Sequence, residues 1–95
     1  MHGLKIAAPE DHTWHTSIKR HFDMNLTPFS EEFRTFKISF EPEQDIGYVC
    51  RLRARRRSGR DLAVTVHHND GEAAIAFAFA RARRELQRSC QIGRR

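Results

Sequence analysis

The residues of this sequence best suited to binding chemistry are arginines, and three of them, Arg81, Arg84 and Arg88, are spaced three and four residues apart. That spacing places them on one face of a helix, where like charges repel by about 0.2–0.5 kcal/mol per pair. A guanidinium is always charged and binds a phosphate through two parallel hydrogen bonds. The pattern therefore predicts a surface for phosphate groups outside the chain. The alternative is a solvated face that keeps the protein soluble.

A second group of arginines follows a period of two. Arg51, Arg53 and Arg55 alternate with other residues in the way that outward side chains alternate along a half-buried strand. Three more surround the turn that follows, namely Arg56, Arg57 and Arg60. We expect some of these side chains to contact RNA, although a charged edge that prevents aggregation between sheets would have the same composition.

The positive charge is concentrated in the second half of the sequence. Residues 1–45 contain five Lys or Arg and eight Asp or Glu, whereas residues 46–95 contain twelve arginines and four acids, within a net charge of +5. The bias toward arginine favours nucleic acid over a generic polyanion, because the guanidinium binds phosphate and stacks on bases. A GC-rich genome would explain the choice of arginine over lysine but not the clustering.

The sequence predicts no enzyme, metal site or cofactor. It contains no nucleophile turn, glycine-rich phosphate loop or recognisable pair of carboxylates. The histidines that suggest a metal site have no cysteine close in sequence, and they are His12, His15, His21, His67 and His68. We therefore expect no reaction and no small-molecule substrate.

The cysteines and the apolar segments indicate the cellular compartment of the protein. Cys50 and Cys90 fit no short metal spacing and are interpreted as free thiols in a reducing environment. No apolar stretch has the length of a signal peptide or of a membrane span. The protein is predicted to be cytoplasmic, without a membrane partner.

The elements that position the arginines fit one domain, residues 1–95, with a flexible basic tail at about 90–95. An apolar content of 39% is enough for a small core. The first predicted element is a strand at residues 3–8, which Pro9 ends. A helix capped by Asp11 or Thr13 follows, with an apolar residue at every fourth position until Pro28. These positions are Trp14, Ile18, Phe22 and Leu26.

Strands are predicted in the middle of the chain. From Phe33 the apolar period changes to two, and the inward positions are Phe36, Ile38 and Phe40. After a turn at residues 42–47, a strand with Tyr48, Cys50, Leu52 and Ala54 inward leads to a hairpin turn at Ser58 and Gly59. Its partner strand has inward positions at Leu62, Val64 and Val66.

The last helix is predicted from about Asp70 to Ser89, because Asn69 and Glu72 have the spacing of a capping box. Its apolar face consists of Ile75, Phe79, Ala82, Leu86 and Cys90. The opposite face carries Arg81, Arg84 and Arg88, in a strip that begins at Phe77. We expect Phe77 to pack under a loop; the alternative is stacking on a base.

The order of elements predicts the fold class. Strand, helix, three strands and helix give an α+β domain, β-α-β-β-β-α, with an antiparallel-rich four-stranded sheet. Both helices are expected on one face of the sheet, because that arrangement buries every apolar stripe.

With these elements in place, the sequence resembles the short ribosome hibernation-promoting factors, also described as ribosome-associated inhibitor A, of the sigma-54 modulation or S30EA family. The first anchor is the apolar spacing Leu26, Phe29, Phe33, Phe36, Ile38 and Phe40. The second is the pattern Asp70, Ala73, Ala74, Ile75, Arg81, Arg84, Leu86 and Arg88. With the matching order of elements, the likeness covers nearly the whole chain.

The resemblance implies that Arg81, Arg84 and Arg88 contact 16S ribosomal RNA in the decoding channel of the small ribosomal subunit, where they would block mRNA and tRNA. The first helix of the family is basic, and this sequence offers Lys19 and Arg20 there. Since the sequence ends at Arg95, we expect a short form without the C-terminal dimerisation domain and a monomer off the ribosome.

Two other functions fit the same residues. Strand-strand-strand-helix order also occurs in double-stranded RNA-binding domains, so a stand-alone module for structured RNA is one alternative. The other is a regulatory subunit whose arginines bind an acidic protein partner.

Overall fold

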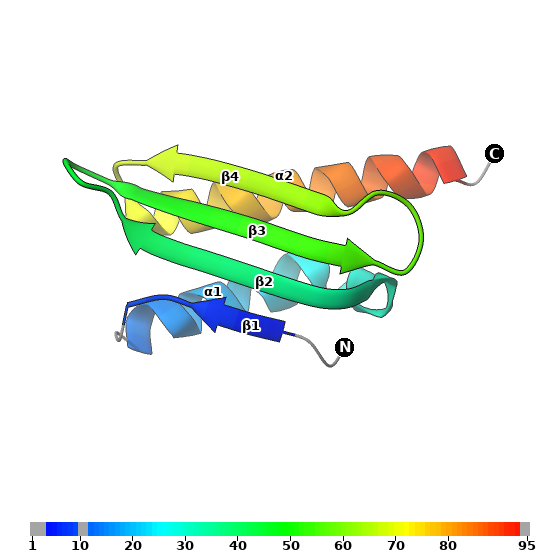
Figure 1. The fold of residues 1–95 in the computed structure, drawn as a ribbon, viewed down its shortest axis with the longest axis horizontal. Helices are drawn as coiled ribbons and strands as arrows, with labels where there is room; N and C mark the ends of the chain where they lie inside the picture. Colours follow the sequence, from blue (N-terminus) through cyan, green and yellow to red (C-terminus); the bar gives the residue numbers. More distant parts are fainter. Residues whose placement is uncertain (1–3, 10–11, 94–95) are drawn as a thin grey trace.

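The computed structural model describes residues 4–9 and 12–93, and it contains the predicted order of elements. Figure 1 shows them along the chain. They are β1 (Leu4–Ala7), α1 (His12–Leu26), the 3-10 helix η1 (Thr27–Glu32), β2 (Phe33–Pro42), β3 (Tyr48–Arg56), β4 (Leu62–His68) and α2 (Gly71–Gly93). The α+β class and the order β-α-β-β-β-α are confirmed.

The four strands form one sheet in the order β1-β2-β3-β4. The pairs β2–β3 and β3–β4 are antiparallel, and β1 is parallel to β2. The sheet is therefore mixed and antiparallel-rich, as predicted. The parallel pair follows from α1, since a parallel pair needs a long crossover connection and a helix provides one.

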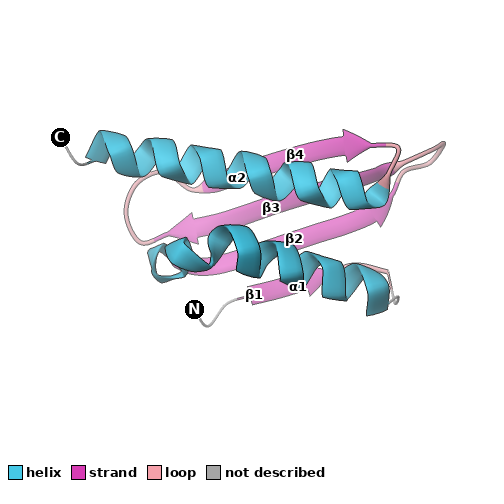
Figure 2. Ribbon diagram, turned by 180° about the vertical axis from the view of Figure 1, so that it is seen from behind, coloured by secondary structure: helices cyan, strands magenta, loops and turns pink. Residues whose placement is uncertain are grey.

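Both helices cover the same face of the sheet, as Figure 2 shows from behind. The core lies between these two layers, and the strands contribute the predicted side chains: Phe36, Ile38, Phe40, Cys50, Leu52, Ala54, Leu62 and Val64. From α1 it receives Ile18, Phe22 and Leu26, and from α2 Ile75, Phe79, Ala82 and Leu86. Among the residues that the structure describes, no helix covers the opposite face of the sheet.

The start of α2 differs from the prediction. Asp70, not Asn69, caps the helix: its Oδ1 accepts a hydrogen bond from the Glu72 backbone N–H at 3.0 Å, and its carbonyl accepts one from Ala74 at 2.9 Å. An N-cap side chain reaches the second or third N–H after it, which Asp70 does and Asn69, one residue earlier, does not. The capping box predicted for Asn69 and Glu72 is therefore wrong.

The end of α2 also differs, since the helix continues to Gly93 instead of ending near Ser89. No glycine or proline interrupts residues 72–92, and either residue would favour an earlier end. Of the predicted basic tail, residues 94–95 lie outside the part of the chain that the structure describes. The same holds for Asp11 as a candidate cap and for the side chain of Cys90.

Candidate nucleic-acid interface

Arg81, Arg84 and Arg88 lie on the exposed side of α2, opposite the buried side chains of Phe79 and Leu86. Their predicted orientation away from the core is confirmed. At a rise of about 1.5 Å per residue, the strip extends over roughly 10 Å. We call these three residues the α2 strip.

The α2 strip is not neutralised within the protein. In residues 4–9 and 12–93 none of its three arginines makes an ion pair, although Glu85 belongs to the same helix. Arg81 donates a long hydrogen bond of 3.5 Å from Nη1 to the backbone carbonyl of Thr65 on β4. This contact leaves the guanidinium charge uncompensated and directs it along the edge of the sheet.

Phe77 heads the α2 strip and is not packed under a loop. Its side chain is 55% exposed, and its ring lies 5.5 Å from the ring of His68, measured between centroids. His68 is held in place because its Nδ1 accepts a hydrogen bond from the Asp70 backbone N–H at 2.9 Å. The expected packing under a loop is wrong because Phe77 falls outside the buried face of α2, beside the end of β4, where its ring contacts that of His68 and stays largely exposed.

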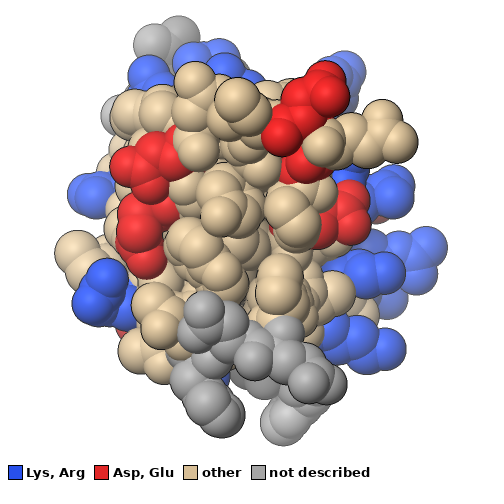
Figure 3. All heavy atoms as spheres, turned by 90° about the vertical axis from the view of Figure 1, so that its left-hand side faces the viewer, with Lys and Arg blue, Asp and Glu red and all other residues tan. Residues whose placement is uncertain are grey.

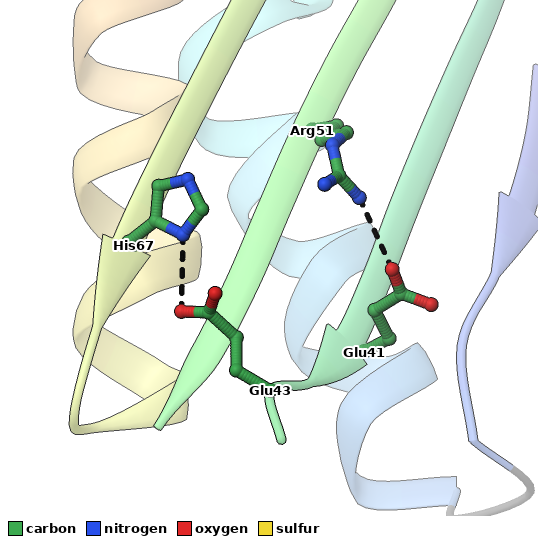
Figure 4. A network of polar contacts seen from close by, with 4 residues as sticks. All are labelled: Glu41, Glu43, Arg51 and His67. Atoms are coloured by element: carbon green, nitrogen blue, oxygen red, sulfur yellow. Dashed lines mark hydrogen bonds and ion pairs between the residues drawn. The ribbon is translucent and has the colours of Figure 1, made fainter. Parts of the chain in front are cut away.

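The strand arginines lie on the uncovered face of the sheet, as predicted, but they are not equivalent. Arg51, Arg53 and Arg55 are all exposed. Arg51 makes an ion pair of 3.1 Å with Glu41, whereas Arg53 and Arg55 make none with the residues that the structure describes. Figure 4 shows the Arg51–Glu41 pair beside a second contact, between His67 and Glu43 at 3.0 Å. Arg51 is therefore the least available of the three.

Arg56 belongs to the protein interior. Its side chain is 8% exposed, and its Nη2 lies 2.8 Å from Glu32 Oε1 in η1. Its backbone N–H also donates to Asp61 Oδ1 at 3.3 Å, across the hairpin. The guanidinium thus joins η1 to the β3–β4 hairpin and is not free to contact RNA, in contrast to the exposed Arg57 and Arg60.

Lys19 and Arg20 are exposed on α1, next to the first turns of α2. Arg20 lines a hollow together with Ser17 and Glu72, and the buried Ser17 hydroxyl donates to Glu72 Oε2 at 2.8 Å. Glu72 therefore bridges the helices and brings a negative charge close to Arg20. Burial lowers the pKa of His21 nearby, with Glu72 raising it and Arg20 lowering it further.

The eight predicted residues do not form one patch. The α2 strip and the pair Lys19 and Arg20 lie on the helical side, and the strand arginines lie on the uncovered face of the sheet. Figure 3 views the molecule from the end that holds the β2–β3 loop, and basic side chains project on both of its flanks. The protein therefore carries basic side chains both on its helices and on the uncovered face of the sheet.

Two lysines of the uncovered face were missed as candidate residues. Lys5 on β1 and Lys37 on β2 are register partners, and Lys37 is also the partner of Arg53 on β3. The alternating pattern did place Lys37 on the outer side of its strand. The pairing of the strands, which brings these cations together, was not visible in the pattern.

The structure also bears on metal binding, thiol reactivity and membrane insertion. Within the part of the chain that the structure describes, no group of three His, Cys, Asp or Glu side chains is arranged to hold a metal ion. Burial raises the pKa of the Cys50 thiol to about 12, so this cysteine is a core residue in its protonated form. No helix among the described residues is long and apolar enough to cross a membrane.

Comparisons with known proteins identify the fold. No protein-family model matches the sequence, and no curated protein is similar to it in sequence. Among solved structures, a ribosomal subunit interface protein from Coxiella burnetii matches with a TM-score of 0.79 at 8% identity, covering 94% of this chain and 98% of that one. The N-terminal domain of Protein Y from Thermus thermophilus matches with a TM-score of 0.70 at 14% identity, covering 93% and 98%.

These identities are low enough that the likeness is one of fold. It extends over nearly the whole length of all three chains. The fold expected from the resemblance to ribosome hibernation factors is thereby confirmed: the chain has the fold of a ribosomal subunit interface protein and of the Protein Y N-terminal domain.

Proposed function

We propose that this protein is a cytoplasmic ribosome-associated inhibitor of translation, which binds 16S ribosomal RNA in the decoding channel of the small subunit and occludes mRNA and tRNA. The observation that carries the proposal is the α2 strip, three exposed arginines without an ion pair among the described residues. A fold shared with a ribosomal subunit interface protein supports the choice of the ribosome as partner.

Binding requires no reaction. The guanidinium groups neutralise phosphates and release counterions, which contributes about 0.7 to 0.9 to the slope of log affinity against log salt for each phosphate. Three arginines of the α2 strip correspond to a slope contribution of roughly −2 to −3. Inhibition is then steric, because the folded domain occupies the space of mRNA and tRNA.

Phe77 adds a second kind of contact to the α2 strip. Its exposed ring stands at the head of the three arginines, and His68 supports it on one side. Stacking of an unpaired base on an aromatic ring contributes about 1–3 kcal/mol and tolerates any base. We assign Phe77 this role in binding an unpaired nucleotide of the ribosomal RNA.

The test is sedimentation of the protein with purified small subunits at low and at high salt. We expect co-sedimentation at low salt, its loss at high salt, and its loss at low salt for the variant Arg81→Gln, Arg84→Gln, Arg88→Gln. A matched control removes three exposed arginines outside the α2 strip, through Arg34→Gln, Arg57→Gln and Arg60→Gln, and should keep more of the binding than the α2-strip variant does.

The outcomes separate this function from the alternatives. Equal binding of the α2-strip variant and the wild type would refute the role of the strip. Protein that binds a free RNA duplex but not small subunits would indicate a stand-alone module for structured RNA. Protein that binds neither at any salt concentration would indicate a regulatory subunit with an acidic protein partner.

A further inference from the structure

The uncovered face of the sheet carries a row of cations that crosses three strands. Lys5 on β1 is the register partner of Lys37 on β2, and Lys37 is the partner of Arg53 on β3. The row ends at Ala63 on the edge strand β4. Neighbouring strands lie about 4.8 Å apart, so the row spans roughly 10 Å at its base.

The charge of this row is not compensated within the described part of the protein. Lys5, Lys37 and Arg53 are exposed, and no ion pair involves any of them. Like charges directly opposite each other on a sheet destabilise it. An external anion that lies across the strands would relieve this repulsion, since each site between two neighbouring cations attracts negative charge from both sides.

The row opens into a hollow of about 380 Å³, where Arg55 and Thr35 join Lys37, Arg53 and Ala63 in the lining. The small side chains of Thr35 and Ala63 leave room above the backbone of the sheet. Asp61 also lines the hollow, but its Oδ1 accepts the backbone N–H of Arg56 at 3.3 Å. Three basic side chains and one acidic side chain leave the hollow positively charged.

The composition of this face favours RNA over an acidic protein. Protein interfaces concentrate their binding energy in buried aromatic and apolar side chains. The exposed large apolar residues among the described ones are Met24, Ile46 and Phe77, and none of them belongs to a strand of the sheet. A surface with cations and small polar residues, and with no exposed Phe, Tyr or Trp ring on its described strands, suits the phosphate backbone of RNA and does not read bases.

We infer that the uncovered face of the sheet, through Lys5, Lys37, Arg53 and Arg55, is a second RNA-binding surface that binds phosphates independently of base sequence. Because the α2 strip lies on α2 beside the edge strand β4, outside the row on β1, β2 and β3, the protein would bind two RNA segments at once. The inference shares only the class of partner, RNA, with the proposed function. It holds or fails without the α2 strip.

The experiment measures the affinity of the purified protein for a short fluorescent RNA duplex of arbitrary sequence over a range of salt concentrations. The sheet variant Lys5→Gln, Lys37→Gln, Arg53→Gln should reduce the slope of log affinity against log salt by about 2 to 3, given 0.7 to 0.9 per phosphate. The α2-strip variant, measured in parallel, should reduce the same slope by the contribution of its three arginines. The combined variant should lose both.

Two controls separate specific contacts from net charge. Arg51→Gln removes the same charge from the same face of the same strand as Arg53→Gln, but Arg51 is already paired with Glu41. The single variant Arg53→Gln should therefore weaken binding several-fold more than Arg51→Gln. The charge-conserving variant Lys5→Arg, Lys37→Arg, Arg53→Lys should keep the slope of the wild type.

An unchanged slope in a folded sheet variant would overturn the inference, and so would equal losses for Arg51→Gln and Arg53→Gln. The inference would also be overturned if the sheet variant lost binding to polyglutamate as strongly as it lost binding to RNA. The uncovered face would then bind acidic polypeptides. If the α2-strip variant kept wild-type affinity and the sheet variant lost it, the role of the α2 strip in the proposed function would be refuted. The second RNA-binding surface would then still be supported. A melting temperature for each variant shows that it is folded.

Discussion

Lys37 and Arg53 face each other directly across the antiparallel pair of β2 and β3, with like charge and without an ion pair to any residue that the structure describes. Lys5 continues the row on the other side of Lys37. Such a pairing lowers the stability of a sheet. The second RNA-binding surface inferred above would account for this unfavourable pairing.

Lys37→Glu should therefore stabilise the protein while it weakens RNA binding. The new carboxylate would lie between two cations, and each opposite-charge pair across strands contributes about 0.2–1 kcal/mol. We expect the free energy of unfolding in urea to rise by about 0.5–2 kcal/mol. Lys37→Gln, which removes repulsion without adding attraction, should fall in between. A loss of stability in Lys37→Glu would contradict repulsion between Lys37 and its two cationic neighbours.

The sequence predicts those features that depend on local pattern. The alternation of apolar and basic residues correctly places Arg53 and Arg55 on the outer face, and the helical period correctly places Arg81 opposite the core. The opposition of Lys37 and Arg53 depends on strand register, which the turn geometry and the packing of the hydrophobic face determine. Sequence pattern alone does not specify that register.

Arg56 shows a second limit of sequence pattern. It follows the same run of arginines as Arg53 and Arg55, yet its guanidinium is paired with Glu32, 24 residues earlier. The β2 strand has an irregularity between Phe33 and Thr35, and Phe33 is the register partner of Arg56. Arg56 has the same parity as the inward residues Leu52 and Ala54, so the period of two separates it from the exposed Arg55. What the local pattern does not give is its partner Glu32, which is distant in sequence.

The ion pair between Glu32 and Arg56 should contribute to stability. Glu32→Ala would leave a guanidinium that is 8% exposed without its carboxylate at 2.8 Å. Removing one partner of a buried charge pair is strongly unfavourable, and for this partly buried pair we expect a loss of about 2 kcal/mol in the free energy of unfolding. Glu31→Ala, at an exposed neighbouring position, is the control and should change stability little. Equal effects of the two substitutions on stability would mean that the Arg56 guanidinium is solvated and does not depend on Glu32.

Gly71 allows α2 to begin against α1 and β2. A Cβ at this position would lie 2.5 Å from Trp14 Cη2 and 3.0 Å from Phe40 Cζ, so a methyl group forces the Trp14 ring to move. Such overpacking costs about 1–3 kcal/mol, and Gly71→Ala should lower the midpoint of urea denaturation accordingly. In a Trp14→Leu background the same substitution should cost less. A Gly71→Ala cost that is independent of Trp14 would rule out this contact as its cause.

Cys50 should make stability fall at alkaline pH. Burial raises the pKa of its thiol from 9.0 to about 12 in the folded protein. Between these values the unfolded chain releases the proton and the folded protein keeps it, so unfolding is favoured as pH rises. The contribution of Cys50 is complete below pH 9 and is lost as the pH approaches about 12. Urea denaturation at several pH values between these limits measures the loss.

Cys50→Ala provides the comparison, in a Cys90→Ser background that leaves Cys50 as the remaining thiol. The cavity left by this substitution lowers stability at every pH, whereas the titration affects only the alkaline range. The difference in unfolding free energy between the two proteins should therefore shrink from pH 9 upward. The Cys50 thiol should also resist alkylation in the native protein and react after unfolding, because the thiolate is the nucleophile. A constant difference in free energy together with rapid native alkylation would mean that the thiol is accessible and has an ordinary pKa.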